Sequence, residues 1–246
     1  ADDYAYPERL ELQYKFLKEN RKIGVVSGTV TYSGERNKNL GYALYVDWIN
    51  SLKTPDQIYF NRFVESPVCH PSVMIRKKLF DEYGLYKVGS FPEDYELWLR
   101  FMDQGVQFSK VDEVILDWYD DENRLSRNHT NYDPAAFFDI KTKYFFKWYR
   151  KTFEFKPRPL LIWGTGKSVI EKSKHLEDYN LEIVGYVDVI RKKDHSINGK
   201  PVFFYEDIPE GVFLLSYVSD RKGRQMIHEF LIKNNYEEGK DFYMMS

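Results

Sequence analysis

The residues best suited to chemistry are three carboxylates, Glu93, Asp94 and Glu96, which fall within four positions at the start of a predicted helix. Pro92 precedes them and suits a first helical turn, and Gly105 ends the pattern. A carboxylate near a helix N-terminus faces backbone N–H groups, which favour its ionised form, so a general base fits this position. The same carboxylates also fit a plain capping cluster on a surface helix, and spacing alone leaves both readings open.

The elements that must position these residues follow from hydrophobic periodicity, and they predict an α/β chain. Helices are expected over 8–20, 42–52, 77–83, 92–104, 137–149, 167–179 and 221–234. Strands are expected over 23–32, 160–163, 183–188 and 212–218, and one or two strands within 106–117. Segment 66–76 is expected to be a loop that enters a strand. In the last helix we expect Met226, Phe230 and Leu231 to point inward.

Composition excludes several classes of protein. The 246 residues carry a net charge of −2, so bulk electrostatics indicates neither a nucleic-acid partner nor an anionic-membrane partner. Cys69 is the single cysteine, which excludes a disulfide framework and fits a reducing cytoplasm. No apolar run approaches the roughly 20 residues of a membrane span. Aromatic residues make up 17% of the chain, which suits either a sugar-binding surface or an aromatic core, and we favour the core.

A change of pattern divides the chain. Pro157 and Pro159 mark a basic linker, so we expect domains at 1–150 and 159–246, joined by 151–158. Strand–helix–strand alternation after the linker predicts a small parallel, Rossmann-like domain. Gly164 and Gly166 follow its first strand, and Asp188 lies 24 residues after Gly164, where a ribose-binding acid would be. These residues are therefore candidates for binding NAD or another nucleotide, although a domain of this kind that binds none is equally consistent.

Two segments together resemble family 2 glycosyltransferases with the GT-A fold. The first is the start Ala1-Asp2-Asp3 with the helix led by Pro7-Glu8-Arg9-Leu10, and the second is Glu93 to Arg100. The resemblance implies a GT-A half, built on a mixed sheet with helices, and an inverting transfer from a nucleotide-sugar donor to a glycan or lipid-linked acceptor. It implies Mn²⁺ or Mg²⁺ as cofactor and a role in bacterial surface polysaccharide synthesis.

The resemblance also assigns residues to the metal. Asp2 matches the second Asp of the family's Asp-x-Asp, Asp3 is its neighbour, and Asp121 stands about where many members carry a histidine ligand. The first Asp would precede residue 1, so we expect a chain truncated through the donor site, with little activity by itself. Solvated acids at a chain start are the plain alternative.

Catalytic and binding roles are carried over in the same way. The family pattern makes Asp94 the general base, with Glu93 as second choice. The resemblance makes His70 and Trp98 candidates for contacting donor or acceptor. It makes Arg124 and Arg127 candidates for holding the donor diphosphate, or, in the plain reading, two solvated arginines. Glu96 is expected to pair with Arg100, four residues further on.

Two other classes of function stay open. One is a nucleotide-binding or sensing module at Gly164, Gly166 and Asp188, of which an NAD-dependent oxidoreductase is the enzymatic version. The other is a structural assembly domain. For the transferase, the expected location is the cytoplasm, including peripheral association with the inner face of a bacterial membrane.

Overall fold

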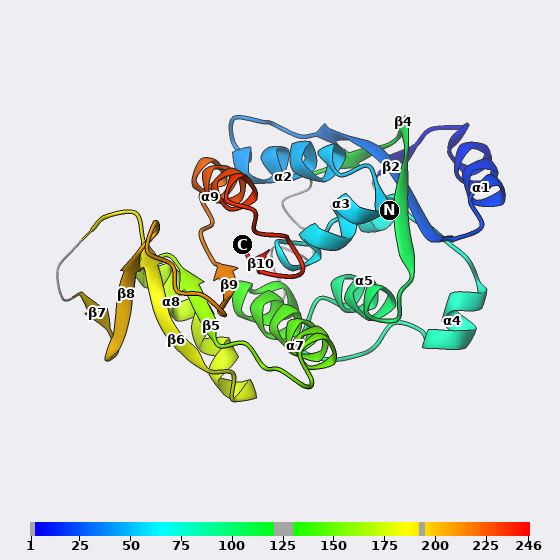
Figure 1. Cartoon of the computed structure of the whole chain (residues 1–246). Helices are drawn as coiled ribbons and strands as arrows, with labels where there is room; N and C mark the ends of the chain where they lie inside the picture. The colour runs from blue at the N-terminus through cyan, green and yellow to red at the C-terminus, as the bar shows by residue number, and fades with distance from the viewer. Residues whose placement is uncertain (1–2, 121–129, 192–194) are drawn as a thin grey trace. The chain divides into compact units, whose positions relative to one another are not determined.

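The computed structural model describes residues 3–120, 130–191 and 195–246 (Figure 1). The fold is mixed α/β, as predicted, with two separate sheets. The chain forms two compact units, which we describe one at a time. Unit 1 comprises residues 1–62 and 66–137, and unit 2 comprises 63–65 and 138–246.

Unit 1 alternates helices with the strands of a four-stranded sheet. Its elements are β1 (Tyr4–Ala5), α1 (Arg9–Glu19), β2 (Ile23–Ser33), α2 (Leu40–Ser51), α3 (Pro55–Phe60), η1 (Asn61–Phe63), η2 (His70–Ser72), β3 (Met74–Ile75), α4 (Lys78–Tyr83), α5 (Glu93–Asp103), β4 (Gln107–Tyr119), η3 (Thr130–Tyr132) and the start of α7 (Pro134–Thr152). The strand order is β1-β4-β2-β3. The two long strands β2 and β4 are parallel, and the short outer strands run antiparallel to them.

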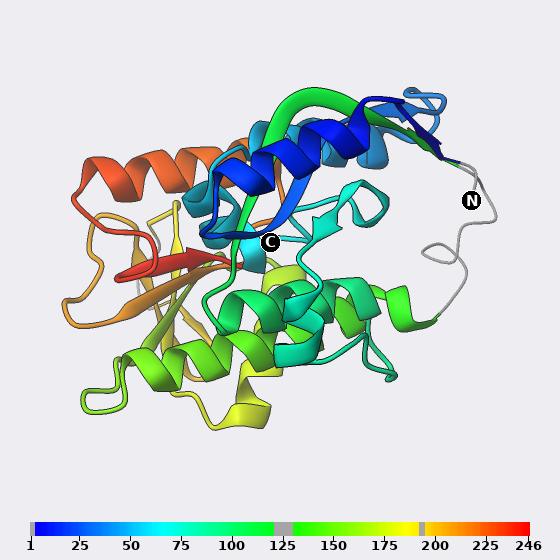
Figure 2. The same ribbon diagram turned by 90° about the vertical axis from the view of Figure 1, so that its right-hand side faces the viewer.

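The core of unit 1 lies where α1 and α2 pack on β2 and β4. α1, dark blue in Figure 2, crosses in front of β4 and turns Leu17 inward. Gln13 on the same face is fully buried, and its side-chain amide donates to the carbonyls of Val26 and Ser72 at 2.9 and 2.8 Å. A buried amide must be paired, so Gln13 ties α1 to both β2 and η2. The helix thereby holds the segment that carries His70.

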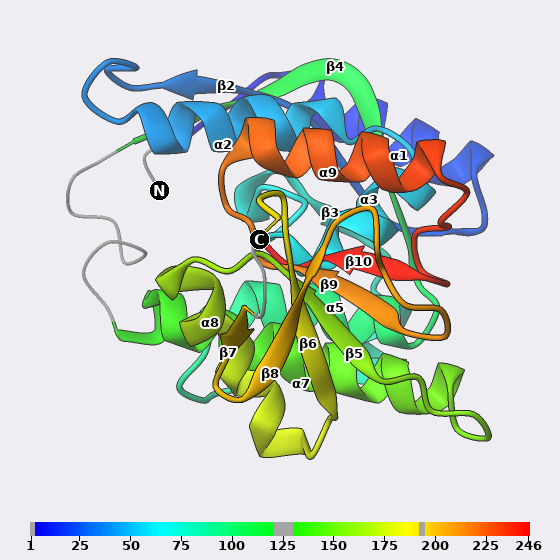
Figure 3. The ribbon, with the colours of Figure 1, turned by 60° about the vertical axis from the view of Figure 1, so that its left-hand side comes forward.

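Unit 2 contains a six-stranded, mainly parallel sheet (Figure 3). After α7 its elements are β5 (Leu160–Trp163), α8 (Lys167–Ser173), η4 (Lys174–Tyr179), β6 (Ile183–Asp188), β7 (Ser196–Ile197), β8 (Lys200–Phe204), β9 (Phe213–Ser216), α9 (Arg221–Lys233) and β10 (Phe242–Met244). The order is β10-β9-β5-β6-β8-β7, and only the short outer β7 is antiparallel.

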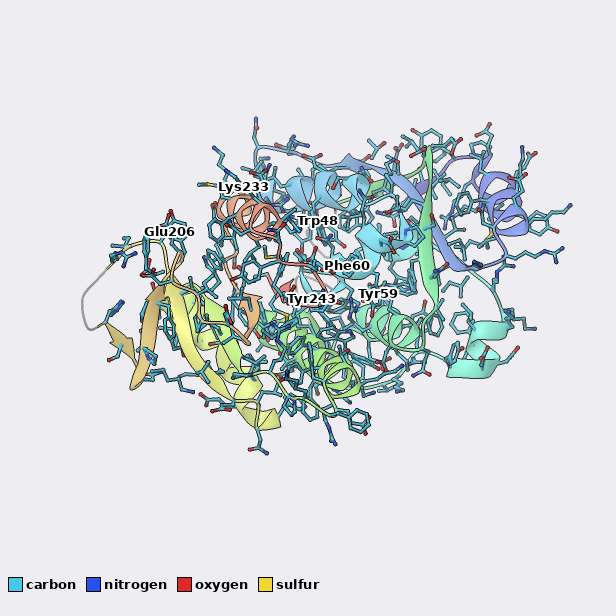
Figure 4. The ribbon with its side chains drawn as sticks, in the orientation of Figure 1. Trp48, Tyr59, Phe60, Glu206, Lys233 and Tyr243 are labelled. Atoms are coloured by element: carbon cyan, nitrogen blue, oxygen red, sulfur yellow. The ribbon has the colours of Figure 1, made fainter. Side chains whose placement is uncertain are left out.

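Helices cover both faces of this sheet. Trp148 of α7 packs against Phe213 of β9 and against Tyr243 of β10, which Figure 4 labels, with ring centroids 5.5 and 4.7 Å apart. Trp163 of β5 packs against Phe230 of α9 at 5.6 Å. Phe213 pairs with Leu160, three residues before Trp163, so Phe213 and Trp163 point to opposite faces. The apolar strands predicted at 160–163 and 212–218 are therefore buried on both sides.

Residues 63–65 belong to unit 2 because a buried lysine of α7 holds them. Lys141 Nζ donates to the carbonyls of Val64 and Met245 at 2.8 and 3.1 Å. Burial lowers the pKa of Lys141 to about 7. The lysine thus joins three segments that are far apart in the sequence.

Most predicted elements are present, and two expectations need comment. Met226 is wrong as an inward residue, because 69% of it is exposed, whereas Leu231 of the same helix is buried. Met226 lies five residues before Leu231, about 500° around the helix, which puts the two on different sides. The units divide after Phe137, inside α7, whereas the sequence placed a linker at 151–158. The division into domains at 1–150 and 159–246 stays a prediction. In the described ranges no helix has the length and apolarity to cross a membrane.

A buried lysine in unit 1 makes stability depend on pH. Lys110 of β4 donates to the carbonyl of Ile49, and burial lowers its pKa to about 7. The unfolded chain keeps an ordinary lysine pKa of about 10.4, so between these values it binds one more proton than the folded chain. The free energy of unfolding should therefore rise with pH in this window by about 1.4 kcal/mol per pH unit from Lys110. Below pH 7 Lys110 is charged in both states, and the destabilisation caused by burying its charge is then at its full value.

We expect Lys110→Met to remove this contribution. The measurement is urea unfolding at several pH values between 7 and 10, beside the exposed Lys22→Met as control. If the free energy of unfolding changed with pH by the same slope in both variants, the assignment to Lys110 would be wrong.

Candidate functional site

The first turn of α5 presents the predicted base. Pro92 occupies the N-cap with an extended backbone, and Glu93 and Asp94 follow in the first turn. Oδ1 of Asp94 accepts from the N–H of Tyr95 at 2.8 Å, and the residue is partly exposed. Burial raises the pKa of the Asp94 carboxyl, and the nearby His70 opposes that rise. Asp94 is therefore a partly exposed residue whose carboxyl group is dehydrated by its surroundings.

His70 lies beside Asp94 and is held by two aromatic side chains. Its Nε2 lies 2.8 Å from the hydroxyl of Tyr86, and its ring contacts that of Trp98 edge-on at 5.8 Å. Burial and the charges of Asp94 and Glu93 raise the pKa of Tyr86, so its hydroxyl stays protonated. Trp98 is fully buried, which places it behind His70 rather than at the surface.

Glu93 is bound to a residue 39 positions further along the chain. The Tyr132 hydroxyl lies 2.8 and 2.7 Å from the two oxygens of Glu93. Burial and the Glu93 carboxylate raise the pKa of Tyr132, so it remains a donor. Asn131 Nδ2 donates to the carbonyl of Gly89 at 3.0 Å. The chain that follows residues 121–129 is thus attached beside Asp94.

A buried ion pair within α5 stabilises this arrangement. The predicted pairing of Glu96 with Arg100 is confirmed, with Nη2 to Oε2 at 3.0 Å and both side chains buried. Arg100 also donates to the carbonyls of Tyr83, Gly84 and Leu85. The guanidinium thereby fixes the turn that ends α4 and delivers Tyr86 to His70.

Asp3 lies at the end of β4. Its Oδ1 accepts from the N–H of Tyr119 at 2.9 Å, because β1 pairs with the end of that strand. Arg9 lies between this acid and the His70 segment, and its Nη2 donates to the carbonyl of Val73 at 3.4 Å. Burial lowers the pKa of Arg9, and the charge of Asp3 partly offsets this. Arg9 thus links the two parts of unit 1 that carry predicted site residues.

Several predicted site residues lie outside the described residues, namely Asp2, Asp121, Arg124 and Arg127. Of the three predicted metal ligands only Asp3 is described. Within the described ranges no group of three His, Cys, Asp or Glu side chains is arranged to hold a metal ion.

The predicted nucleotide residues of unit 2 form a turn with internal hydrogen bonds. Gly164 has φ +116°, and a Cβ there would come within 2.9 Å of Val169, so the turn requires glycine. Asp188 accepts from the Thr165 hydroxyl at 2.7 Å and from the N–H of Ile190 at 3.0 Å. Both carboxylate oxygens of the predicted ribose-binding acid are therefore engaged inside the unit. A Cβ at Gly166 would meet nothing within 4 Å. The nucleotide hypothesis stays a prediction.

The structure thus brings together Glu93, Asp94, His70 and Trp98, which come from two segments of the sequence. Sequence reasoning missed Tyr86, Tyr132 and Arg9. Tyr86 follows Gly84 at the end of a predicted helix, which was the one local signal for it. Nothing in the sequence connects Tyr132 with Glu93, because that contact exists only in the folded chain.

Comparison with known proteins points to sugar transfer. No family model matches the chain. It is 28% identical over 134 residues to the uncharacterized glycosyltransferase MJ1057 of Methanocaldococcus jannaschii, covering 52% of this chain and 43% of that protein. It is 25% identical over 145 residues to the O-antigen biosynthesis glycosyltransferase WbnJ of Escherichia coli, covering 56% and 50%. These relatives are glycosyltransferases by name.

A third relative is also a glycosyltransferase by name. The amylovoran biosynthesis glycosyltransferase AmsE of Erwinia amylovora is 28% identical over 116 residues, which is 47% of this chain and 41% of that protein. The chain therefore spans about half the length, or somewhat less, of the curated relatives it matches. The similarity supports a glycosyltransferase role.

Proposed function

We propose that this chain is part of a family 2 glycosyltransferase of the GT-A type. It transfers a sugar from a nucleotide-sugar donor to a glycan or lipid-linked acceptor, with inversion at the anomeric carbon. The names of two relatives, which refer to O-antigen and amylovoran biosynthesis, support a role in surface polysaccharide synthesis. The order of the parallel strands in unit 2, β8-β6-β5-β9-β10, supports a Rossmann-like second domain.

The observation that carries the proposal is the environment of Asp94. Asp94 is a partly exposed residue at the first turn of α5, its carboxyl has a raised pKa, and it lies near a histidine that contacts aromatic side chains. A raised pKa makes a carboxylate a better proton acceptor while it stays ionised near neutral pH. A capping carboxylate on a surface helix would be more hydrated and would not need this surrounding structure.

The proposed reaction is a single displacement. The acceptor hydroxyl attacks the anomeric carbon as the bond from that carbon to the donor diphosphate breaks. Asp94 takes the hydroxyl proton as the new glycosidic bond forms. Glu93, which accepts from the Tyr132 hydroxyl, keeps the segment after residue 129 beside the base, and His70 is proposed to orient the acceptor or a phosphate oxygen.

Asp2, Asp3 and Asp121 are proposed to hold Mn²⁺ or Mg²⁺. Carboxylate oxygens suit these hard cations, and Asp3 has one of its two oxygens bonded to Tyr119 N–H. When bound, the metal would neutralise charge on the departing nucleoside diphosphate. Arg124 and Arg127 are proposed to contact the same diphosphate.

The test is a transfer or hydrolysis assay with common sugar nucleotides on the full-length protein, with and without Mn²⁺. We expect activity that requires metal, and we expect Asp3→Ala to weaken Mn²⁺-dependent binding of a nucleoside diphosphate about 10–100-fold. Glu113→Ala, at an exposed position of β4, is the matched control. Absence of metal-dependent activity with every common donor would contradict the proposal and favour a binding module at Gly164 and Gly166.

A further inference from the structure

A cavity of about 650 Å³ on unit 1 lies away from Asp94, between the C-terminal half of α1 and the segment that runs from β3 into α4. α1 and α4 lie at the right of Figure 1, and that side faces the viewer in Figure 2. The cavity lining includes five cationic side chains, Lys18, Arg21, Arg76, Lys77 and Lys78, and no acidic one. The chain as a whole carries −2, so this concentration of positive charge is local.

Four of the five cations are available to a ligand. Arg76 has a structural role, because its guanidinium donates to the carbonyls of Leu17 and Ile23 and so caps the end of α1. The other four, Lys18, Arg21, Lys77 and Lys78, are exposed, and none forms an ion pair with any residue in the described part of the chain. Such uncompensated charges on two sides of one cavity favour an anionic ligand.

Apolar side chains adjoin these charges. Leu10 and Tyr14 are 67% and 65% exposed, and with Lys18 they follow at four-residue spacing along one side of α1. Tyr14 also lines the cavity, whose other lining side chains include Leu17 and Met74. An exposed leucine and tyrosine add nothing to the binding of a free phosphate. They match a helix that lies in a membrane interface, with cations at the headgroups and apolar side chains below them.

We propose that this surface, formed by Leu10, Tyr14, Lys18, Arg21, Lys77 and Lys78, docks unit 1 on an anionic phospholipid membrane. The cations contact lipid phosphates, and Leu10 and Tyr14 enter the interface. Attraction of this kind adds up over several Lys and Arg side chains and weakens with salt. The proposal assigns a surface to the membrane association expected for the transferase. Its test does not depend on sugar transfer, since vesicle binding requires neither donor nor metal.

The test is flotation of the full chain with neutral phosphatidylcholine vesicles and with vesicles that also contain about 30% phosphatidylglycerol, an anionic lipid. We expect binding to the anionic vesicles that falls as salt is raised. The variant Lys18→Gln/Arg21→Gln/Lys77→Gln/Lys78→Gln should lower the partition coefficient at least about tenfold. The control Lys143→Gln/Lys174→Gln/Lys222→Gln/Lys233→Gln removes the same charge from exposed positions of unit 2 and should bind as the unmodified chain does.

A second variant tests the apolar part without changing charge. Leu10→Ser/Tyr14→Ser should reduce vesicle binding severalfold while its circular dichroism and melting temperature stay unchanged, because both side chains are exposed. Equal binding to neutral and anionic vesicles, or equal losses in the two glutamine variants, would overturn the proposal. So would a rise in melting temperature with inorganic phosphate that the four-site variant abolishes, if no vesicle binding is seen, because the cavity would then be a plain anion site.

Discussion

Asp94→Asn should lower the turnover of the full-length protein by about 10²–10⁴-fold while leaving donor binding intact. The amide keeps the size of the side chain and can still accept from the N–H of Tyr95, so α5 should begin as before. It lacks the basicity needed to take the acceptor proton. Turnover and binding of the nucleoside diphosphate are measured separately, because a general base affects only the first.

A control variant and a pH profile make this prediction specific. Asp103→Asn makes the same change at the other end of α5 and should leave turnover unchanged. Burial raises the pKa of Asp94, and the base works only when ionised, so activity should fall with decreasing pH at a higher pH than an ordinary aspartate would give. That fall should be absent in Asp94→Asn. Full turnover in the variant, or a greater loss in Glu93→Gln, would contradict the assignment.

Arg100→Met should lower the free energy of unfolding of unit 1 by about 3–5 kcal/mol. The arginine is buried against Glu96 and holds three backbone carbonyls at the end of α4. Its removal takes the buried cation away from the Glu96 carboxylate and takes this donor away from those three carbonyls. Chemical denaturation followed by tryptophan fluorescence measures the loss.

Lys87 supplies the matched control, because it also pairs with Glu96, at 3.4 Å, but is largely exposed. Lys87→Met should cost less than about 1 kcal/mol, as exposed ion pairs do. The double variant Glu96→Gln/Arg100→Met should recover part of the stability lost in Arg100→Met, since no buried charge remains. If Arg100→Met lowered the free energy of unfolding as little as Lys87→Met does, the Glu96–Arg100 pair would not be a major source of stability.

Much of the fold could be read from the sequence because its signals are local. The periodicity of α1, α5, α7 and α9 placed each helix to within a few residues, and Gly84 and Gly105, both with positive φ, end α4 and follow α5 as expected. The short strands β1 and β10 were missed, whereas β3 was expected as the strand that segment 66–76 enters. Two or three residues carry no periodicity, and they become strands only because a longer neighbour pairs with them.

In the candidate site, too, some features could be predicted from the sequence and others are visible only in the folded chain. By itself the sequence determined that a cluster of carboxylates opens α5 and that Glu96 pairs with Arg100, because both depend on helical spacing. Only the tertiary structure decided that Tyr132 binds Glu93 across 39 residues, that Tyr86 meets His70, and that Lys141 draws residues 63–65 into unit 2. Long-range contacts depend on how sheets and helices pack, which no local pattern encodes. The basic cavity was likewise decided only by the tertiary structure, because Lys18 and Lys77 come from elements that lie together only after folding.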